Sequence, residues 1–416
     1  MRAGTHMIGC AAVLAAAAVS QCCLVRGQDK IPPLPRGAAE DRSDFPDLSQ
    51  LPPLQRTLYL SARRGAEWLW QANRADGLFI PGQLPALNQT TEEDSFVRQA
   101  GAAGALALAA RFTGIKRYEM RAKQAALALL AGTKTDPDDS GGRFPVAPAT
   151  AAGRLAAAGL MVLCIHELPE PGGDLLDPAD ELCRFIQRQQ QDDGALAMQG
   201  EPEEEQLAAA GQALLGLVQS DIARPSPARL ETACKALPRY RSRWLNCREP
   251  AAAAQLTSAF AAAYLRTRDK AFADAVIEMA DWLCTLQIAF NPKHREWQGG
   301  FGGCRNGRAV PQRPGIESAQ IALALADACA AVRLAGDVER QARYREAVER
   351  GLEFVATLQY TPANTRHFAE WYGPQLYGAF FASPVDGNTR LDYAQYGVSA
   401  MLRYLDKVAE SPVRKK

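Results

Sequence analysis

The 416-residue sequence is poor in histidine and has no excess of either charge. It contains four histidines, and its 47 Lys and Arg residues are balanced by 46 Asp and Glu residues. Nucleic-acid-binding proteins usually carry a basic excess or a basic stripe, and neither is visible in this sequence. The same balance gives no support to binding at an anionic membrane surface. We therefore expect no nucleic-acid partner.

Motifs for metals and cofactors are also missing. Beyond residues 1–26 the only histidines are His166, His294 and His367. His294 lies between Cys284 and Cys304 in the sequence, but this spacing fits no zinc motif. There is no P-loop, no dinucleotide fingerprint and no nucleophile elbow. We therefore expect no metal site and no cofactor.

The cysteines form no regular framework. The sequence has ten cysteines and no CxxC motif, and several of the cysteines lie in apolar helical stretches where Cys acts as a small core residue. In an oxidising compartment two pairings are open, Cys234 with Cys247 and Cys284 with Cys304. The odd number of cysteines beyond the first 26 residues leaves at least one thiol free.

The N-terminal segment resembles an export signal. Arg2 is followed by an apolar stretch over residues 7–19 and then by Ser20 and Gln21. We expect residues 1–26 to be a signal peptide that directs the protein to the periplasm or the extracellular space. An uncleaved membrane anchor is the alternative, because apolar residues resume at 22–25. No later segment is long and apolar enough to span a membrane without charges, so we expect no membrane span in the mature chain.

The rest of the chain divides into a linker, a repetitive body and a tail. Residues 27–55 are rich in Pro and Asp without any period, which predicts a disordered linker. Residues 56–408 form the body, and residues 409–416 form a basic tail. We expect folded structure to begin near Leu58.

The body alternates two kinds of helical segment. Segments of the first kind are rich in Ala, Leu, Gly and Val and carry few charges, so they should be buried on most sides. They are residues 95–111, 150–168, 205–220, 254–266, 315–334 and 390–405. Segments of the second kind are amphipathic, and they are residues 58–71, 116–131, 176–190, 226–240, 271–287 and 342–359. This alternation predicts an all-α toroid in which six outer helices surround six inner helices.

Similar turns follow several outer segments. Each places one or two glycines before an aromatic or apolar residue, as at 71–79, 141–144, 187–196, 299–301 and 378–380. Glycine supplies the positive φ that ends a helix, and the aromatic ring can fill the gap between hairpins.

The alternation and these turns resemble the α/α-toroid superfamily, which includes triterpene cyclases and protein prenyltransferases. The same architecture resembles six-hairpin glycosidases and several polysaccharide lyases and epimerases. The resemblance covers residues 58–408 and implies an (α/α)6 toroid, but it leaves function open. Residues 136–139 match the DxDD acid motif of squalene–hopene cyclases, yet their proline-containing context before Gly141 and Gly142 favours an ordinary turn.

In such a toroid, every loop from an outer to an inner helix lies at one end of the ring, which we call the mouth. The inner helices begin there, so their free N–H groups converge on it. The two longest of these loops, residues 288–314 and 360–389, are rich in aromatic residues that suit sugar rings or isoprenoid chains. The candidate substrate-binding residues are Arg98, Gln99, Gln320, Trp297, Phe301, Trp371, Tyr372 and Arg390.

The candidate catalytic residues lie where inner helices begin. They are Asp94, Glu317, Asp392 and Tyr393. A facing pair of carboxylates could serve as general acid and base or as a nucleophile. The alternative is a structural role, since Thr91 with Asp94 and Thr389 with Asp392 have the spacing of capping boxes. Glu317 likewise suits the first turn of a helix electrostatically.

Three functions remain open at this point. The first is an exported carbohydrate-active enzyme, a hydrolase, lyase or epimerase, acting on a polysaccharide. The second is an enzyme related to terpene cyclases or prenyltransferases, and the third is a non-catalytic toroid that binds a glycan or a protein partner. We expect a monomer with a glycan or another small-molecule ligand at the mouth. Carboxylates that face one another would favour catalysis, whereas carboxylates that cap their own helices would favour binding.

Overall fold

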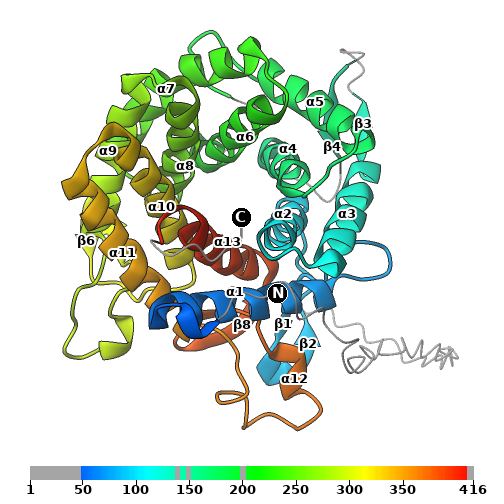
Figure 1. Ribbon diagram of the computed structural model, residues 1–416, viewed down its shortest axis with the longest axis vertical. Helices are drawn as coiled ribbons and strands as arrows, with labels where there is room; N and C mark the ends of the chain where they lie inside the picture. The colour runs from blue at the N-terminus through cyan, green and yellow to red at the C-terminus, as the bar shows by residue number, and fades with distance from the viewer. Residues whose placement is uncertain (1–47, 136–140, 147–150, 197–202, 410–416) are drawn as a thin grey trace, which may run out of the picture. The chain divides into compact units, whose positions relative to one another are not determined.

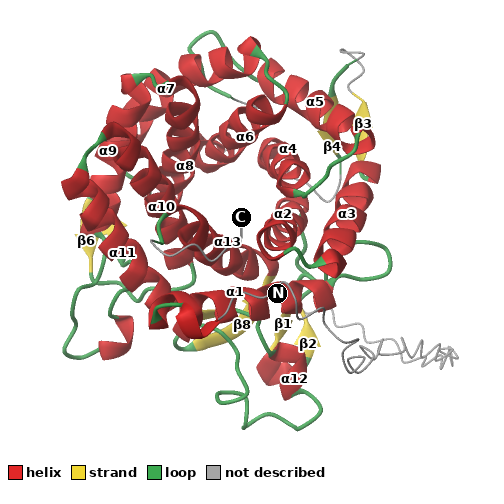
Figure 2. Ribbon diagram, in the orientation of Figure 1, coloured by secondary structure: helices red, strands yellow, loops and turns green. Residues whose placement is uncertain are grey.

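The computed structural model describes residues 48–135, 141–146, 151–196 and 203–409, and these residues belong to one compact unit. Two concentric rings of helices make up this unit (Figures 1 and 2). The inner ring consists of α2 (Phe96–Thr113), α4 (Ala151–Glu167), α6 (Glu203–Ala223), α8 (Pro250–Thr267), α10 (Glu317–Ala335) and α13 (Leu391–Lys407). The outer ring consists of α1 (Pro53–Ala72), α3 (Lys116–Ala131), α5 (Gly173–Arg188), α7 (Pro227–Cys247), α9 (Lys270–Thr285) and α11 (Val338–Thr357). Neighbouring inner helices pack together and α13 closes the ring between α10 and α2, which confirms the predicted toroid.

Some of the predicted segments lie outside the described residues. These are the signal peptide, most of the linker, the DxDD-like residues 136–139 and nearly all of the basic tail. The first outer helix begins at Pro53, a few residues before the expected start at Leu58. Proline is favoured at this first helical position because it has no N–H to satisfy.

Glycine allows the inner helices to approach one another closely. A Cβ atom at Gly159 of α4 would lie 2.5 Å from the backbone oxygen of Gln212 in α6. A Cβ atom at Gly211 of α6 would lie 2.6 Å from the Cβ of Gln255 in α8. Any larger residue at these positions would push the helices apart. The small residues that identified the inner helices in the sequence are therefore the ones that allow the ring to be narrow.

Short strands lie in the loops at the mouth. The strands β1 (Gly82–Leu84), β2 (Gln89–Thr90), β7 (Phe381–Ser383) and β8 (Asp386–Arg390) form an antiparallel sheet in the order β2-β1-β8-β7. Because β1 follows α1 and β8 precedes α13, the pairing of Gly82 with Arg390 joins the first and last hairpins. Two smaller sheets, β3 (Thr133–Thr135) with β4 (Arg143–Pro145) and β5 (Gly303–Arg305) with β6 (Arg308–Val310), lie before α4 and α10. The sequence predicted none of these strands, because two to five residues are too few to show a period.

The recurring turns fasten each outer helix to the next. Their glycines Gly77, Gly194, Gly299 and Gly378 have φ between 85° and 91°. At the end of α11, Gln359 Nε2 donates to the backbone oxygens of Gly378 at 3.0 Å and of Ser61 in α1 at 2.9 Å. At the end of α9, Gln287 Nε2 donates in the same way to Gly299 and to Ala347 in α11. Each terminal amide therefore holds both its own turn and the following outer helix.

The turn aromatics behave as predicted. Phe79, Phe301 and Phe380 are all buried, at 0%, 4% and 0% exposure. They fill the gaps between the hairpins.

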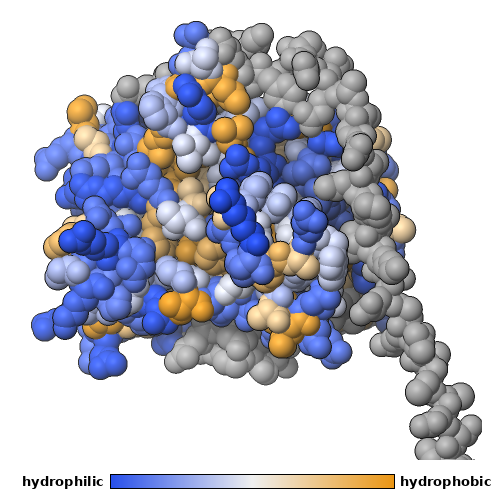
Figure 3. All heavy atoms as spheres, turned by 90° about the horizontal axis from the view of Figure 1, so that it is seen from below, coloured by the Kyte–Doolittle hydropathy of each residue, from blue (hydrophilic) through white to orange (hydrophobic). Residues whose placement is uncertain are grey.

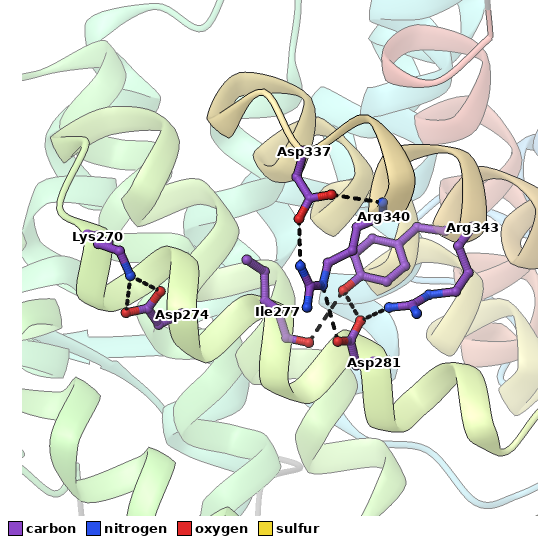
Figure 4. Close-up of polar contacts among 8 residues, drawn as sticks. Lys270, Asp274, Ile277, Asp281, Asp337, Arg340 and Arg343 are labelled. Atoms are coloured by element: carbon purple, nitrogen blue, oxygen red, sulfur yellow. Dashed lines mark hydrogen bonds and ion pairs between the residues drawn. The ribbon is translucent and has the colours of Figure 1, made fainter.

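Carboxylates also connect adjacent outer helices. Asp281 of α9 accepts hydrogen bonds from Arg340 Nε at 3.2 Å and from the Tyr344 hydroxyl, both on α11 (Figure 4). On another side of the ring, Glu67 of α1 accepts a hydrogen bond from the Tyr118 hydroxyl of α3 at 2.8 Å. Both tyrosine rings are fully buried. These contacts give the charged faces of the outer helices a structural role.

The disulfide predictions were wrong, since all seven cysteines in the described part of the chain are free thiols. Cys234 and Cys247 both lie on α7, more than three turns and about 20 Å apart. A disulfide requires Cα atoms within about 7 Å. Cys284 at the end of α9 and Cys304 in β5 are partly buried and unlinked.

One described helix, α10, is long and apolar enough to cross a membrane. However, 78% of its apolar window is buried inside the ring. Its length and composition are explained by its place among the inner helices, which are surrounded by other helices.

Candidate functional site

The first turn of α13 presents an ion pair at the mouth. Asp392 Oδ1 accepts a hydrogen bond from Arg390 Nε at 3.0 Å, and Oδ2 contacts a second nitrogen of the same guanidinium. The hydrogen bond with Asp392 raises the pKa of Arg390 above its ordinary value. Arg98 of α2 lies nearby, with its Nε 3.9 Å from Asp392 Oδ1. Asp392 is 9% exposed, so the end of β8 and the inner helix α2 each bring a guanidinium group to a largely buried carboxylate.

Both predicted capping boxes were wrong. Thr389 Oγ1 accepts a hydrogen bond from the backbone N–H of Gln83 at 3.1 Å, so it holds the sheet together and does not cap α13. Thr91 Oγ1 accepts from the N–H of Glu93, and Ser95 is the residue that caps α2, by accepting from the N–H of Arg98. The spacing of a capping box is a local signal, and here sheet pairing and a neighbouring serine override it.

Two tyrosines of α13 surround the ion pair. The guanidinium of Arg390 lies 4.6 Å from the ring centre of Tyr393, which is a cation–π contact. Tyr396 lies one helical turn after Asp392, on the same face of α13. Burial raises the pKa of both phenols, and the charges of Asp392 and Glu317 raise it further. Both phenols therefore stay protonated at physiological pH and are able to donate hydrogen bonds.

Glu317 is the first residue of α10 and is exposed. In the described part of the chain, its carboxylate has no hydrogen bond and no ion pair. It lies close enough to α13 to raise the pKa of Tyr393 and Tyr396. Glu317 and Asp392 thus come from neighbouring inner helices, and neither caps its own helix. The charge of each raises the pKa of the same two phenols.

Asp94 and Gln99 have structural contacts instead. Asp94 accepts hydrogen bonds from the N–H of Ser95 at 2.7 Å and from Gln99 Nε2 at 3.0 Å. Gln99 also bonds both backbone groups of Phe79, through its Oε1 at 2.8 Å and its Nε2 at 2.9 Å. These contacts fix the turn before α2, so the structure does not bring Asp94 into the group around Asp392.

Two of the candidate aromatic platforms are used in packing. Trp297 is 8% exposed, and one face of its indole is stacked on His294 at 4.0 Å between ring centres. Phe301 is buried against α11, where a Cβ at Gly351 would lie 2.8 Å from its ring. Neither ring offers a free face to a sugar.

The remaining loop candidates separate into buried and exposed groups. Tyr372 is buried and packs edge-on against Phe368 at 5.6 Å, and Gln320 is 8% exposed in the second turn of α10. Trp371 is 62% exposed, but the short helix α12 (Gly373–Leu376) that follows it lies at the outer edge of the ring (Figure 1). Figure 3 shows the ring from the side, where the surface is mainly hydrophilic with hydrophobic residues in separate patches. Because Trp297, Phe301 and Tyr372 are buried, the polar first turns of the inner helices are better candidates than the loop aromatics.

Tyr396 was not among the candidate catalytic or substrate-binding residues predicted from the sequence. Its position four residues after Asp392 was the available signal, because residues four apart share a helix face. Within the described residues, no group of three His, Cys, Asp or Glu side chains lies close enough to hold a metal ion.

A second set of charges anchors the opposite end of α13. Lys407 Nζ lies 2.9 Å from Asp327 Oδ1 of α10, and an Arg403 nitrogen lies 3.4 Å from Glu167 Oε1 of α4. Both carboxylates are buried. Buried ion pairs are sensitive to geometry, so they fix the position of α13 and with it the ion pair at the mouth.

Comparison of the sequence with protein families and curated proteins does not identify the site. No protein-family model matches the sequence, and no curated protein matches it. Solved structures match its fold. An unsaturated glucuronyl hydrolase specific for heparin has a TM-score of 0.59 at 14% identity, covering 86% of this chain and 99% of that one.

Two further structures have other sugar-related activities in their names. An α-1,6-mannanase from a Salegentibacter species has a TM-score of 0.59 at 12% identity, covering 83% of this chain and 98% of that one. A cellobiose 2-epimerase from Bacillus thermoamylovorans has a TM-score of 0.57 at 11% identity, covering 83% of this chain and 99% of that one. At such low identity the likeness shows the fold, which is that of the six-hairpin glycosidase-like toroids. The resemblance to terpenoid cyclases stays a prediction.

Proposed function

We propose that the chain is a carbohydrate-active enzyme that hydrolyses a glycan at the mouth of the toroid. One observation carries the proposal: Glu317 and Asp392 lie in the first turns of two inner helices that pack against each other, and neither carboxylate caps its own helix. The toroids that share this fold at low identity include a hydrolase, a mannanase and an epimerase of sugars. Export, predicted from residues 7–19, belongs to the same proposal, since polysaccharides are found outside the cytoplasm.

The two carboxyl groups have different surroundings and therefore different roles. Glu317 is exposed at the mouth and has no ion-pair partner among the described residues, so we assign it the role of the general acid, which donates a proton to the glycosidic oxygen as the C–O bond breaks. Asp392 is held in place by Arg390, so it receives the proton of the water that adds to the anomeric carbon. Tyr393 and Tyr396 donate hydrogen bonds to sugar hydroxyls. Because their pKa values are raised, both phenols stay protonated and little tyrosinate is present for a β-elimination, which favours hydrolysis.

The test compares Glu317→Gln and Asp392→Asn with the unchanged protein on a panel of neutral and acidic polysaccharides, by release of reducing ends. We expect each substitution to lower kcat by at least about a hundredfold. Glu317→Gln should leave the thermal unfolding curve unchanged, whereas Asp392→Asn should lower the unfolding temperature, because it removes the charge that pairs with Arg390. Glu92→Gln is the matched control, because Glu92 is an exposed acid before α2. Turnover that survives in both carboxylate variants would remove these residues from the mechanism.

A second candidate function is glycan binding without catalysis. The pairing of Asp392 with Arg390 favours it, because an ion pair can orient a ligand as well as a reacting water. In that case Glu317→Gln would leave binding intact, and no glycan in the panel would give a product with the unchanged protein.

A further inference from the structure

Two arginines lie opposite each other on the hairpin of β5 and β6. Arg305 and Arg308 are Cα partners in its antiparallel register, and both are exposed. Directly opposed residues project their side chains from the same face of a sheet. Like charges in this arrangement destabilise the hairpin, and an anion bound between them would relieve the repulsion.

The hairpin is firmly built and attached to the ring. Asn306 and Gly307, the two turn residues, have φ of 50° and 74°, which is the left-handed conformation of a type I′ turn. The backbone oxygen of Gly307 accepts a hydrogen bond from Trp282 Nε1 of α9 at 3.0 Å. The positions of the opposed arginines are therefore set by a rigid turn.

A third guanidinium lies beside this turn. Arg248, directly after α7, packs its aliphatic carbons against Gly307, where a Cβ would lie 3.2 Å from its Cδ. Its guanidinium lies 5.1 Å from the ring centre of Trp244. Stacking on an aromatic ring orients a guanidinium while its N–H edge stays available to a ligand.

The rest of the loop that contains the hairpin carries more basic than acidic residues. Lys293, Arg295 and Arg313 are exposed residues of the loop that contains the hairpin. Glu296 is the only acid in that loop, and its Oε1 lies 3.2 Å from His294 Nδ1. Glu249, next to Arg248, is occupied in capping α8. We call the six cations the basic rim, and they are Arg248, Lys293, Arg295, Arg305, Arg308 and Arg313.

We propose that the basic rim binds an acidic glycan, a polymer that carries carboxylate or sulfate groups along its length. The planar fork of arginine matches both groups with two parallel hydrogen bonds. Figure 1 shows β6 at the outside of the ring beside α9, so this surface lies apart from the centre of the mouth. It therefore holds the polymer and does not act on the bond that breaks. The choice of a glycan over another polyanion rests on the proposed function.

The experiment measures Kd for polygalacturonate and chondroitin sulfate, with uncharged dextran as the neutral probe, between about 50 and 300 mM NaCl. We expect both acidic polymers to bind, with affinity falling as salt rises, and dextran not to bind. The double substitution Arg305→Gln with Arg308→Gln should weaken binding at least about tenfold at low salt. The matched control is Lys235→Gln with Lys270→Gln, which removes the same charge from lysines already paired with Glu231 and Asp274 on outer helices.

Three results would overturn the proposal. The arginine variant could bind as tightly as the unchanged protein, or the lysine control could lose as much affinity as the arginine variant. Thirdly, a duplex DNA oligonucleotide of similar charge could bind more tightly than either glycan and lose its affinity with the same two arginines, which would assign the surface to nucleic acid. The Glu317→Gln variant separates this proposal from the previous one, because it should abolish turnover and leave the affinity for acidic polymers unchanged.

Discussion

Gln359 connects the last outer helix to the first. Gln359 is 2% exposed, and Ser61, its partner on α1, is 3% exposed. The Ser61 hydroxyl donates to Gln359 Oε1 at 2.8 Å, and Gln359 Nε2 donates to the oxygens of Ser61 and Gly378. The substitution Gln359→Met keeps the length of the side chain and removes all three hydrogen bonds.

The expected loss follows from these contacts. A buried hydrogen bond contributes about 1 kcal/mol net, and partners left unsatisfied in the core cost at least as much. Three bonds therefore predict that Gln359→Met lowers the free energy of unfolding by roughly 3 kcal/mol. Ser61→Ala removes only the hydroxyl bond and should cost about 1 kcal/mol. Gln191→Met is the control, because Gln191 is exposed and its side chain makes only a 3.3 Å contact with the backbone of Gln189.

Urea denaturation followed by circular dichroism measures the free energy of unfolding of all three variants. We expect the largest loss for Gln359→Met, a smaller loss for Ser61→Ala, and a loss close to zero for Gln191→Met. If Gln359→Met lowered the free energy of unfolding by less than about 1 kcal/mol, the Gln359 amide would not contribute to closing the ring.

Two further substitutions test other features of the fold. Gly378→Ala should lower the free energy of unfolding by at least about 3 kcal/mol, because a Cβ there would lie 2.0 Å from the backbone oxygen of Arg64 at a φ of 91°. Gly336→Ala should lower it by only about 1 kcal/mol, because Gly336 has a φ of 77° and a Cβ there would have nothing within 4 Å. Equal losses of stability in urea would contradict the close packing of the turn at Gly378. Burial, with a smaller effect of Arg229, lowers the pKa of His166 to about 4, below its unfolded value near 6.5. As the pH falls between these values the unfolded chain gains a proton that the folded chain does not, so stability should drop by up to about 3 kcal/mol. His166→Gln should remove that part of the loss between pH 7 and about 4.5, and parallel losses in both proteins would show that another group is responsible.

The rings were predictable because the helices of each ring differ in composition. Residues 95–111 were expected to form an inner helix and α2 spans Phe96–Thr113, since a helix surrounded by other helices needs small apolar residues on every side. The outer helices kept the helical period that their charged faces show in the sequence. Bounds were recovered to within a few residues wherever a cap or a turn glycine ended the helix, as at Gly114.

The contacts of the site were less predictable, because they depend on residues far apart in the sequence. Asp392 was identified from its place at the start of an inner helix. Its lack of a capping partner follows from Thr389, which is held by Gln83 of the first hairpin. The basic rim was hidden by the balanced total charge, and Arg248 reaches the hairpin only because Trp282 fixes Gly307 beside it.

The joint between the last and the first hairpin differs from the others in having no peptide link. Elsewhere a short connection joins each inner helix to the next outer helix, as Gly336 and Asp337 join α10 to α11. Between the last hairpin and the first, α13 packs against α1, β8 pairs with β1, and Gln359 donates a hydrogen bond to Ser61 of α1. The chain order can therefore be permuted: a polypeptide that starts at α8, with a linker from Lys407 to Pro53, would keep the contacts between neighbouring helices of the ring. Its new ends would replace the two-residue connection between α7 and α8, Arg248 and Glu249.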